Sequence, residues 1–130
     1  MELFTFGHSM KCAAMATLKI SQDFSPYPGA RYYSDGSFSG EEFYDNCLKG
    51  SFVKSLDARE KLFVDLDGTA GYASSFLSES FGLLAESFGI STVEKNIEII
   101  SKEEPDWKAK ILNDYIPNAL TRKKRATTQG

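Results

Sequence analysis

Residues 61–90 constrain the fold of this chain more than any other segment, because they combine a buried strand, a tight turn and an amphipathic helix. In the strand, Leu62 and Val64 fall on one face and Phe63 on the other. Apolar residues on both faces are typical of a strand inside a parallel sheet. A strand followed by a helix is the repeating unit of α/β domains. We therefore expect an α/β fold built around this unit.

The helix of this unit is predicted to begin at Ser74 or Ser75 and to end near Phe88. Gly89 follows it, and glycine is the residue that most often ends a helix. Inside the helix, apolar residues recur every three or four positions along one stripe, namely Leu77, Phe81, Leu84 and Phe88. In open α/β sheets, function gathers where the carboxyl ends of strands meet helix N-termini. The junction at residues 65–75 is therefore the predicted functional site.

Strands and helices alternate along the rest of the chain. Residues 17–21 alternate as a half-buried strand, and residues 31–33 are predicted to return as its antiparallel partner. A capping box at residues 39–42 opens a helix, which Gly50 weakens and is expected to split. A third core strand is expected at residues 96–101, before a last helix opened by a proline. The predicted fold is a mixed, mostly parallel sheet with an N-terminal antiparallel hairpin and three helices.

The length of 130 residues suits one domain, and an apolar fraction of 42% is enough for a packed core. We expect a flexible leader at residues 1–15, a single small domain at residues 16–120 and a flexible basic tail at residues 121–130. The tail holds four consecutive cations at residues 122–125. A charge run at a terminus is usually a solvated segment.

Charge, cysteine and histidine content argue against several classes of function. The net charge of −3 and the pI near 5.2 provide no field that attracts nucleic acid. No stretch approaches the roughly 20 apolar residues of a membrane span. Cys12 and Cys47 lie far apart and His8 is the only histidine, so neither a disulfide framework nor a zinc site is indicated. We expect a cytoplasmic protein with no cofactor, no bound metal, no nucleic-acid partner and no membrane association.

The six residues VDLDGT, at positions 64–69, allow an enzymatic interpretation. They resemble the first motif of haloacid dehalogenase-like phosphatases, which implies Asp65 as nucleophile and Asp67 as acid/base beside Mg²⁺. Such an enzyme also needs further acidic groups at later strand ends, and the chain after Thr69 has no GDxxxD and no adjacent aspartate pair. The alternative is that both aspartates are hydrogen-bonded turn acids that close the strand.

Two longer strings carry a different resemblance. They are PYPGARYYSDGSFSGEEF at residues 26–43 and KLFVDLDGTAGYASSFLSESFGLL at residues 61–84. Together they resemble the STAS-like domain family of unknown function, which is named for its similarity to the STAS domains of sulfate transporters and anti-sigma factor antagonists. The resemblance covers about residues 17–117 and implies a small STAS-like α/β domain.

The resemblance also implies a site. Anti-sigma factor antagonists carry Asp-Ser-Ser-Gly-Leu before a helix, and phosphorylation of the second serine by a kinase-type anti-sigma factor abolishes binding. Laid on this chain, Ser75 is the candidate phosphoacceptor and Ser74 its neighbour, while Ala73 replaces the aspartate and Phe76 the glycine. The structural alternative for either serine is that its side chain caps the helix.

By analogy with the antagonists, we expect a non-enzymatic regulatory or protein-interaction domain. The expected partner is a protein of the GHKL-type ATPase or kinase class, and the oligomeric state is left open. The small metal-dependent phosphatase is the alternative function. The residues expected to contact the partner lie in the turn and at the helix start: Asp65, Asp67, Gly68, Thr69, Gly71, Tyr72 and Phe76.

The first string is rich in aromatic residues around its turns, at Tyr27, Tyr32, Tyr33 and Phe38. Such clusters usually fill a core or cover a sheet edge, but an exposed remnant would suit partner binding. Arg31, in the same string, is expected to pair with Glu41 or Glu42 or to bind an anion.

Overall fold

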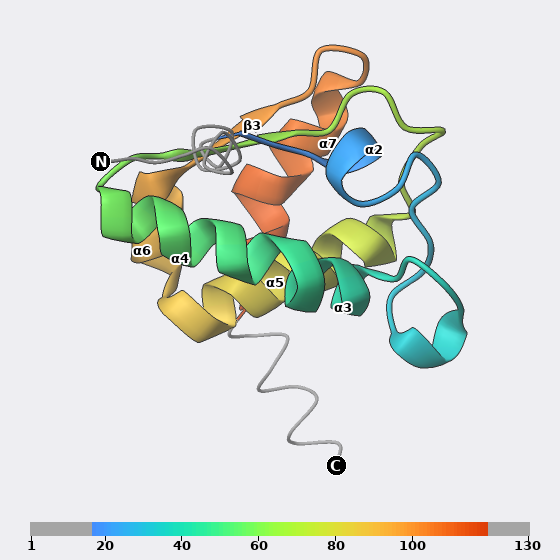
Figure 1. Cartoon of the computed structure of the whole chain (residues 1–130), viewed down its shortest axis with the longest axis horizontal. Helices are drawn as coiled ribbons and strands as arrows, with labels where there is room; N and C mark the ends of the chain where they lie inside the picture. The colour runs from blue at the N-terminus through green and yellow to red at the C-terminus, as the bar shows by residue number, and fades with distance from the viewer. Residues whose placement is uncertain (1–16, 120–130) are drawn as a thin grey trace, which may run out of the picture.

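The computed structural model describes residues 17–119 as a three-stranded parallel sheet with helices packed against one of its faces (Figure 1). The strands are β1 (Thr17–Lys19), β2 (Leu62–Asp65) and β3 (Ile97–Ile100). The α-helices are α2 (Ile20–Asp23), α3 (Gly40–Phe43), α4 (Lys49–Ala58), α5 (Ser74–Phe88), α6 (Ile90–Asn96) and α7 (Pro105–Lys110). A 3-10 turn, η2 (Tyr33–Asp35), and two π-helical turns, η3 (Tyr44–Leu48) and η4 (Ile111–Tyr115), complete the order.

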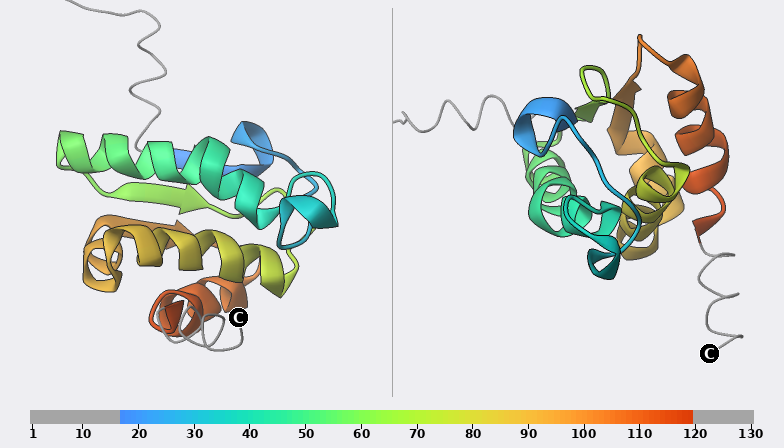
Figure 2. Two further views of the ribbon diagram at one scale, coloured as in Figure 1. Left: turned by 90° about the horizontal axis from the view of Figure 1, so that it is seen from below. Right: turned by 90° about the vertical axis from the view of Figure 1, so that its right-hand side faces the viewer.

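The central position predicted for the strand of the βα unit is confirmed. Strand β2 lies between β1 and β3 and runs parallel to both, with Val64 opposite Leu18 on one side and Ile99 on the other. These residues point to the covered face of the sheet, where α4 and α5 lie side by side (Figure 2). The opposite face is less covered, since Phe63 stays 38% exposed and Glu98 pairs with surface lysines.

The predicted antiparallel hairpin is wrong for the described residues. After β1 the chain winds into α2, because the Asp23 carboxylate accepts a hydrogen bond from the Lys19 N–H at 2.8 Å and closes a helical turn. Residues 31–33 form no strand. The carbonyl of Arg31 accepts a hydrogen bond from the Glu41 N–H of α3 at 3.0 Å, so it is not available to a neighbouring strand. The sheet is therefore wholly parallel in this part of the chain.

The three-helix prediction also differs from the structure. The helix expected after residue 39 is one continuous helical run of α3, η3 and α4, and its irregular π turn lies before Gly50 and not at it. Helices α2 and α6 are short additional segments that the sequence pattern did not indicate. The leader predicted at residues 1–15 and the tail predicted at residues 121–130 lie outside the described residues.

The capping box at the start of α3 is present in a modified form. The Ser39 hydroxyl accepts a hydrogen bond from the Glu42 N–H at 3.1 Å, as expected for an N-cap. The Glu42 carboxylate accepts from the Phe38 N–H at 2.9 Å, one residue before the position that a standard box uses. This arrangement fixes the preceding loop against the helix.

Helices α3 and α5 approach each other closely at Gly40, and this contact positions the start of α5. A Cβ atom at Gly40 would lie 2.6 Å from the Phe76 carbonyl oxygen. One turn later, the rings of Phe43 and Phe76 stack with their centroids 5.6 Å apart. Both phenylalanines are fully buried. The close approach therefore needs glycine at position 40.

Two glycine substitutions in the same helical run test this packing. Gly40→Ala should lower the free energy of unfolding by about 1–3 kcal/mol, because the added methyl group overpacks the contact with α5. Gly50→Ala, where nothing lies within 4 Å of the added atom, should raise it by about 0.5–1 kcal/mol through helix propensity. Chemical denaturation of both variants checks the pair, and a neutral or stabilising Gly40→Ala would contradict the proposed close packing.

Candidate functional site

The carboxyl ends of all three strands meet at one edge of the sheet, where the turn of residues 66–73 links β2 to α5. Lys19 ends β1, Asp65 ends β2, and the loop of residues 101–104 follows β3. Parallel strands bring such residues together even when they are far apart in sequence. The structure thus confirms that the predicted junction lies at the carboxyl edge of the sheet.

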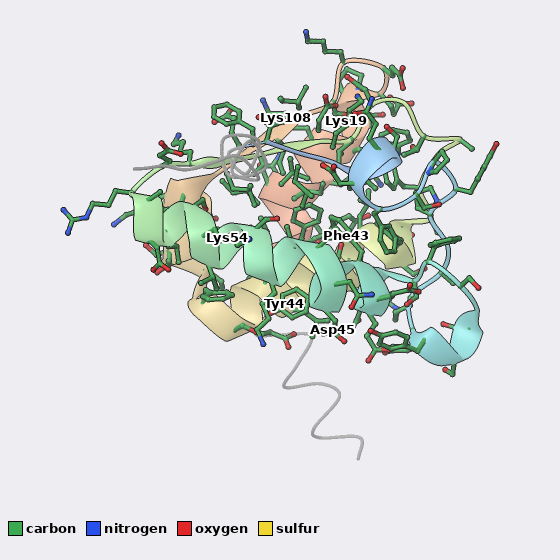
Figure 3. The ribbon with its side chains drawn as sticks, viewed as in Figure 1. Lys19, Phe43, Tyr44, Asp45, Lys54 and Lys108 are labelled. Carbon is green, nitrogen blue, oxygen red and sulfur yellow. The ribbon has the colours of Figure 1, made fainter. Side chains whose placement is uncertain are left out.

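Asp65 joins the ends of β1 and β2. Its Oδ2 atom lies 3.2 Å from Lys19 Nζ, and its Oδ1 atom accepts a hydrogen bond from the Asp67 N–H at 2.9 Å. The same ammonium group donates to the Asp67 carbonyl at 3.2 Å. Figure 3 shows Lys19 next to α2, at the end of β1. Both Asp65 oxygens are therefore engaged within the protein.

Asp67 ties the turn to the loop after β3. Its two carboxylate oxygens accept hydrogen bonds from the Lys102 N–H at 3.1 Å and the Glu103 N–H at 2.9 Å. In return, the Glu103 carboxylate accepts from the Gly68 N–H at 3.0 Å. Three hydrogen bonds thus connect two loops that are about 35 residues apart in sequence.

These contacts bear on the two interpretations of the DLDGT motif. All four carboxylate oxygens of Asp65 and Asp67 accept protein hydrogen bonds or pair with Lys19. Between residues 17 and 119, no group of three or more histidine, cysteine, aspartate or glutamate side chains could hold a metal ion. The arrangement agrees with the interpretation of both aspartates as hydrogen-bonded turn acids that close the strand.

Two glycines give the turn its path. Gly68 has φ 94°, and a Cβ atom there would lie 2.8 Å from the Ser21 hydroxyl oxygen of α2. Gly71 has φ 137°, and its N–H donates to the Thr69 hydroxyl at 3.3 Å. Residues other than glycine rarely adopt these backbone angles. Ala70, between them, donates its N–H to the Pro26 carbonyl at 2.9 Å, which joins the turn to the first aromatic loop.

Tyr72 connects the end of the turn to its beginning and to α7. Its hydroxyl donates to the Leu66 carbonyl at 2.7 Å, and its ring meets Trp107 of α7 edge-on with centroids 4.7 Å apart. Burial raises the pKa of Tyr72 well above the usual range for tyrosine. The hydroxyl therefore stays protonated and keeps its role as a donor at physiological pH.

The serine pair does not cap α5, which corrects the capping alternative. The N-cap is Ala73, with φ −73° and ψ 142°, and its carbonyl accepts the Phe76 N–H at 3.0 Å. Ser74 and Ser75 are the first two helical residues, so the helix begins where it was predicted to begin. Among the described residues, neither serine hydroxyl has a hydrogen-bond partner. Ser74 is exposed and Ser75 is half-buried.

Phe76 has a different place from the one expected. It was predicted to contact a partner, but it is fully buried and its ring packs against Phe24, Phe43 and Tyr72. Phe76 is the third residue of α5, and helix α3 packs closely against it at Gly40. This close packing places the Phe76 side chain in the core. Phe76 therefore supports the helix start from within and offers no surface to a partner.

Sequence reasoning missed four groups of this site and one pairing. Lys19, Ser21, Lys102 and Glu103 all contact the turn, and only the parallel pairing of β1 with β2 brings the first two there. The signal in the sequence was Lys19, a polar residue at the end of an alternating strand. The prediction of a hairpin hid this signal, because it paired that strand with residues 31–33 and not with β2. Arg31 pairs with Glu79 of α5 at 3.4 Å, and not with the glutamates expected for it.

Comparison with known proteins adds one finding. Residues 39–107, more than half of the chain, match the family model described as a STAS-like domain of unknown function (DUF4325). The match begins at the N-cap of α3 and ends in α7, so it includes the turn, α5 and the loop after β3. No curated protein and no solved structure matches the chain. Within residues 17–119, no helix is both long and apolar enough to cross a membrane. The chain belongs to the family of STAS-like domains of unknown function.

Proposed function

We propose that this chain is a non-enzymatic regulatory domain that binds a protein partner through the turn of residues 67–75 and the start of α5. Phosphorylation of Ser75, with Ser74 as the second candidate, would control that binding. Membership of the STAS-like family fits a regulatory domain at this coarse level. The observation that carries the finer proposal is a pair of serine hydroxyls at the first turn of a long helix, with no partner among the described residues.

The turn is suited to docking because the protein holds it in one conformation. Hydrogen bonds from three other segments, namely the end of β1, the first aromatic loop and the loop after β3, fix its backbone, so little conformational entropy is lost when a partner binds. Four of its residues are exposed, namely Gly68, Ala70, Ala73 and Ser74. Five other predicted contact residues and the candidate phosphoacceptor are only half-covered: Asp65, Asp67, Thr69, Gly71, Tyr72 and Ser75. A partner can therefore contact the turn along its length.

The start of α5 also suits a phosphate group. The first N–H groups of a helix have no acceptor within it, and the helix dipole favours negative charge there. In the proposed transfer, the Ser75 oxygen bonds to the γ-phosphorus of ATP while the bond from that phosphorus to ADP breaks. The serine proton passes to a base on the kinase. The phosphate then adds about −2 charge at the first turn of α5, which changes the docking surface.

We place the partner in the GHKL-type ATPase or kinase class by analogy with the antagonists of anti-sigma factors. The analogy lies in the position of the serines, directly after the strand and turn. The departures at Ala73 and Phe76 concern neighbouring residues, and burial of Phe76 shows that its side chain stabilises the helix start. No observation favours the phosphatase as a second candidate function.

Substitution of Ser75 tests the proposed control. Capture of the partner from the native host by tagged Ser75→Ala should equal capture by the wild type, whereas Ser75→Glu should reduce it at least about tenfold, since a carboxylate partly mimics the phosphate charge. The matched control is Ser91→Glu, which changes the second residue of α6 and should leave capture unchanged. Quantitative mass spectrometry of the captured proteins is the measurement.

Two further readings complete that experiment. Ser75→Glu should keep the melting temperature of the wild type or raise it slightly, because an acid in the first helical turn is favourable by about 0.3–1 kcal/mol. Equal capture by Ser75→Ala and Ser75→Glu, with both variants folded, would show that serine control is wrong.

Asp67→Asn distinguishes a scaffold from a catalytic aspartate. The substitution should lower the free energy of unfolding by about 1–2 kcal/mol. The reason is that Asp67 accepts hydrogen bonds from two N–H groups, and in the variant one of these groups loses its acceptor. The control is Asp57→Asn, at an exposed position of α4. Its free energy of unfolding should stay within about 0.5 kcal/mol of the wild-type value. Mg²⁺ should not change the melting temperature of the wild type. A rise with Mg²⁺ that Asp67→Asn abolishes would instead support the phosphatase.

A further inference from the structure

A second surface, formed by the loop before α3, exposes an unusual share of aromatic side chains. Of the six large apolar side chains exposed between residues 17 and 119, four belong to this loop. Tyr27 is 71% exposed, Tyr32 44%, Tyr33 49% and Phe38 40%. The cluster therefore does not fill a core. Exposed aromatic rings that lie close together usually mark a binding surface.

The loop holds two of these rings in fixed positions. The Tyr33 hydroxyl donates to the Asp45 carboxylate at 2.9 Å, and the Tyr33 N–H donates to Glu41 at 2.9 Å. Phe38 has φ 58°, donates its N–H to Glu42 and packs its ring edge-on against Phe24 with centroids 5.6 Å apart. Figure 3 shows Asp45 beside the loop that carries η2. A ligand would meet rings that are already ordered.

The same surface is acidic, although Arg31 lies at its edge against the Tyr32 ring. Residues 32–48 contain four carboxylates and no lysine or arginine. Asp23 of α2 adds a fifth, because α2 meets the α3–η3 run where the Cys47 thiol lies 3.7 Å from the Asp23 carbonyl oxygen. No ion pair among the described residues involves these acids. We name the acidic-aromatic face by six residues: Asp23, Tyr33, Phe38, Glu41, Glu42 and Asp45.

We propose that the acidic-aromatic face binds a cationic, arginine-bearing segment of a partner protein. Its carboxylates do not converge, since no described group of three acids could hold a metal ion. Negative charge spread along ordered aromatic rings suits an extended cationic chain, and guanidinium groups stack on aromatic faces better than ammonium groups do. Within residues 17–119, this geometry occurs where the Arg31 guanidinium lies 5.9 Å from the Tyr32 ring centroid.

This face shares no residue with the turn of residues 66–73 or with the serine pair at the start of α5. It belongs to α2, the first aromatic loop and the α3–η3 run, whereas the turn lies between β2 and α5. Binding of a cationic segment therefore does not depend on Ser75. The Ser75→Glu variant should bind it as the wild type does, so the two proposals can fail independently.

Labelled peptides of alternating glycine and arginine, glycine and lysine, or glycine and glutamate serve as probes for the full chain. The arginine probe should bind at least about threefold more tightly than the lysine probe, and the glutamate probe should not bind. Asp45→Asn keeps an acceptor for Tyr33, and Phe38→Asn suits the left-handed backbone there. Each should weaken arginine-probe binding about threefold to tenfold, and the surface controls Asp57→Asn and Phe63→Ser should not. Fluorescence anisotropy measures the affinities.

Three results would overturn this proposal. Equal binding of the arginine and glutamate probes would show that charge does not select the ligand. Unchanged binding by both Asp45→Asn and Phe38→Asn, with the variants folded, would place the probe elsewhere. Replacement of the four cations at residues 122–125 by serine could also tighten probe binding and shift the Tyr33 amide resonance. In that case the occupant is the chain's own basic run, and not a partner.

Discussion

The site depends on a pair of hydrogen bonds that the Asp67 carboxylate accepts from the N–H groups of Lys102 and Glu103, directly after β3. This pair of bonds is the constraint on which the other contacts of the site are built. It fixes the turn after β2 to the loop before α7 and leaves no carboxylate oxygen without a donor. Asp65 and Lys19 extend the same arrangement to β1. Charged hydrogen bonds of this kind are stronger than neutral ones, and here they connect all three strand ends. The residues that suggested a nucleophile thus serve to hold loops together.

The long aromatic string has a comparable structural purpose. Ser39 caps α3, Glu42 accepts the N–H before that cap, and Gly40 allows α3 to meet α5 at Phe76. The string therefore supports the start of α5 from one side, while the Asp67 bonds support its turn from the other. Arg31 adds an ion pair with the largely buried Glu79. A helix start held from both sides is a suitable base for the proposed serine switch.

Elements with long, regular patterns were predictable from sequence, and short ones were not. The central strand, α5 and β3 were predicted because their apolar periodicity extends over whole elements. The hairpin was wrong because three residues at 31–33 cannot distinguish a strand from a loop whose carbonyls bond to α3. The start of α5 was predicted correctly, but the capping role was not, because Ala73 holds the N-cap position with an extended backbone and no side-chain cap. Parallel pairing of β1, which brings Lys19 to the site, depends on contacts far apart in sequence.

The central claim is that a partner docks on the start of α5, and photo-crosslinking in the native host tests it most directly. A photoreactive residue at exposed position Ser74 should form a covalent adduct with one protein partner. The same residue at exposed Glu94, in α6, should form none. Incorporation of phosphoserine at position 75 should abolish the adduct at 74. An adduct at position 94 but none at 74, from folded protein, would contradict docking at the start of α5.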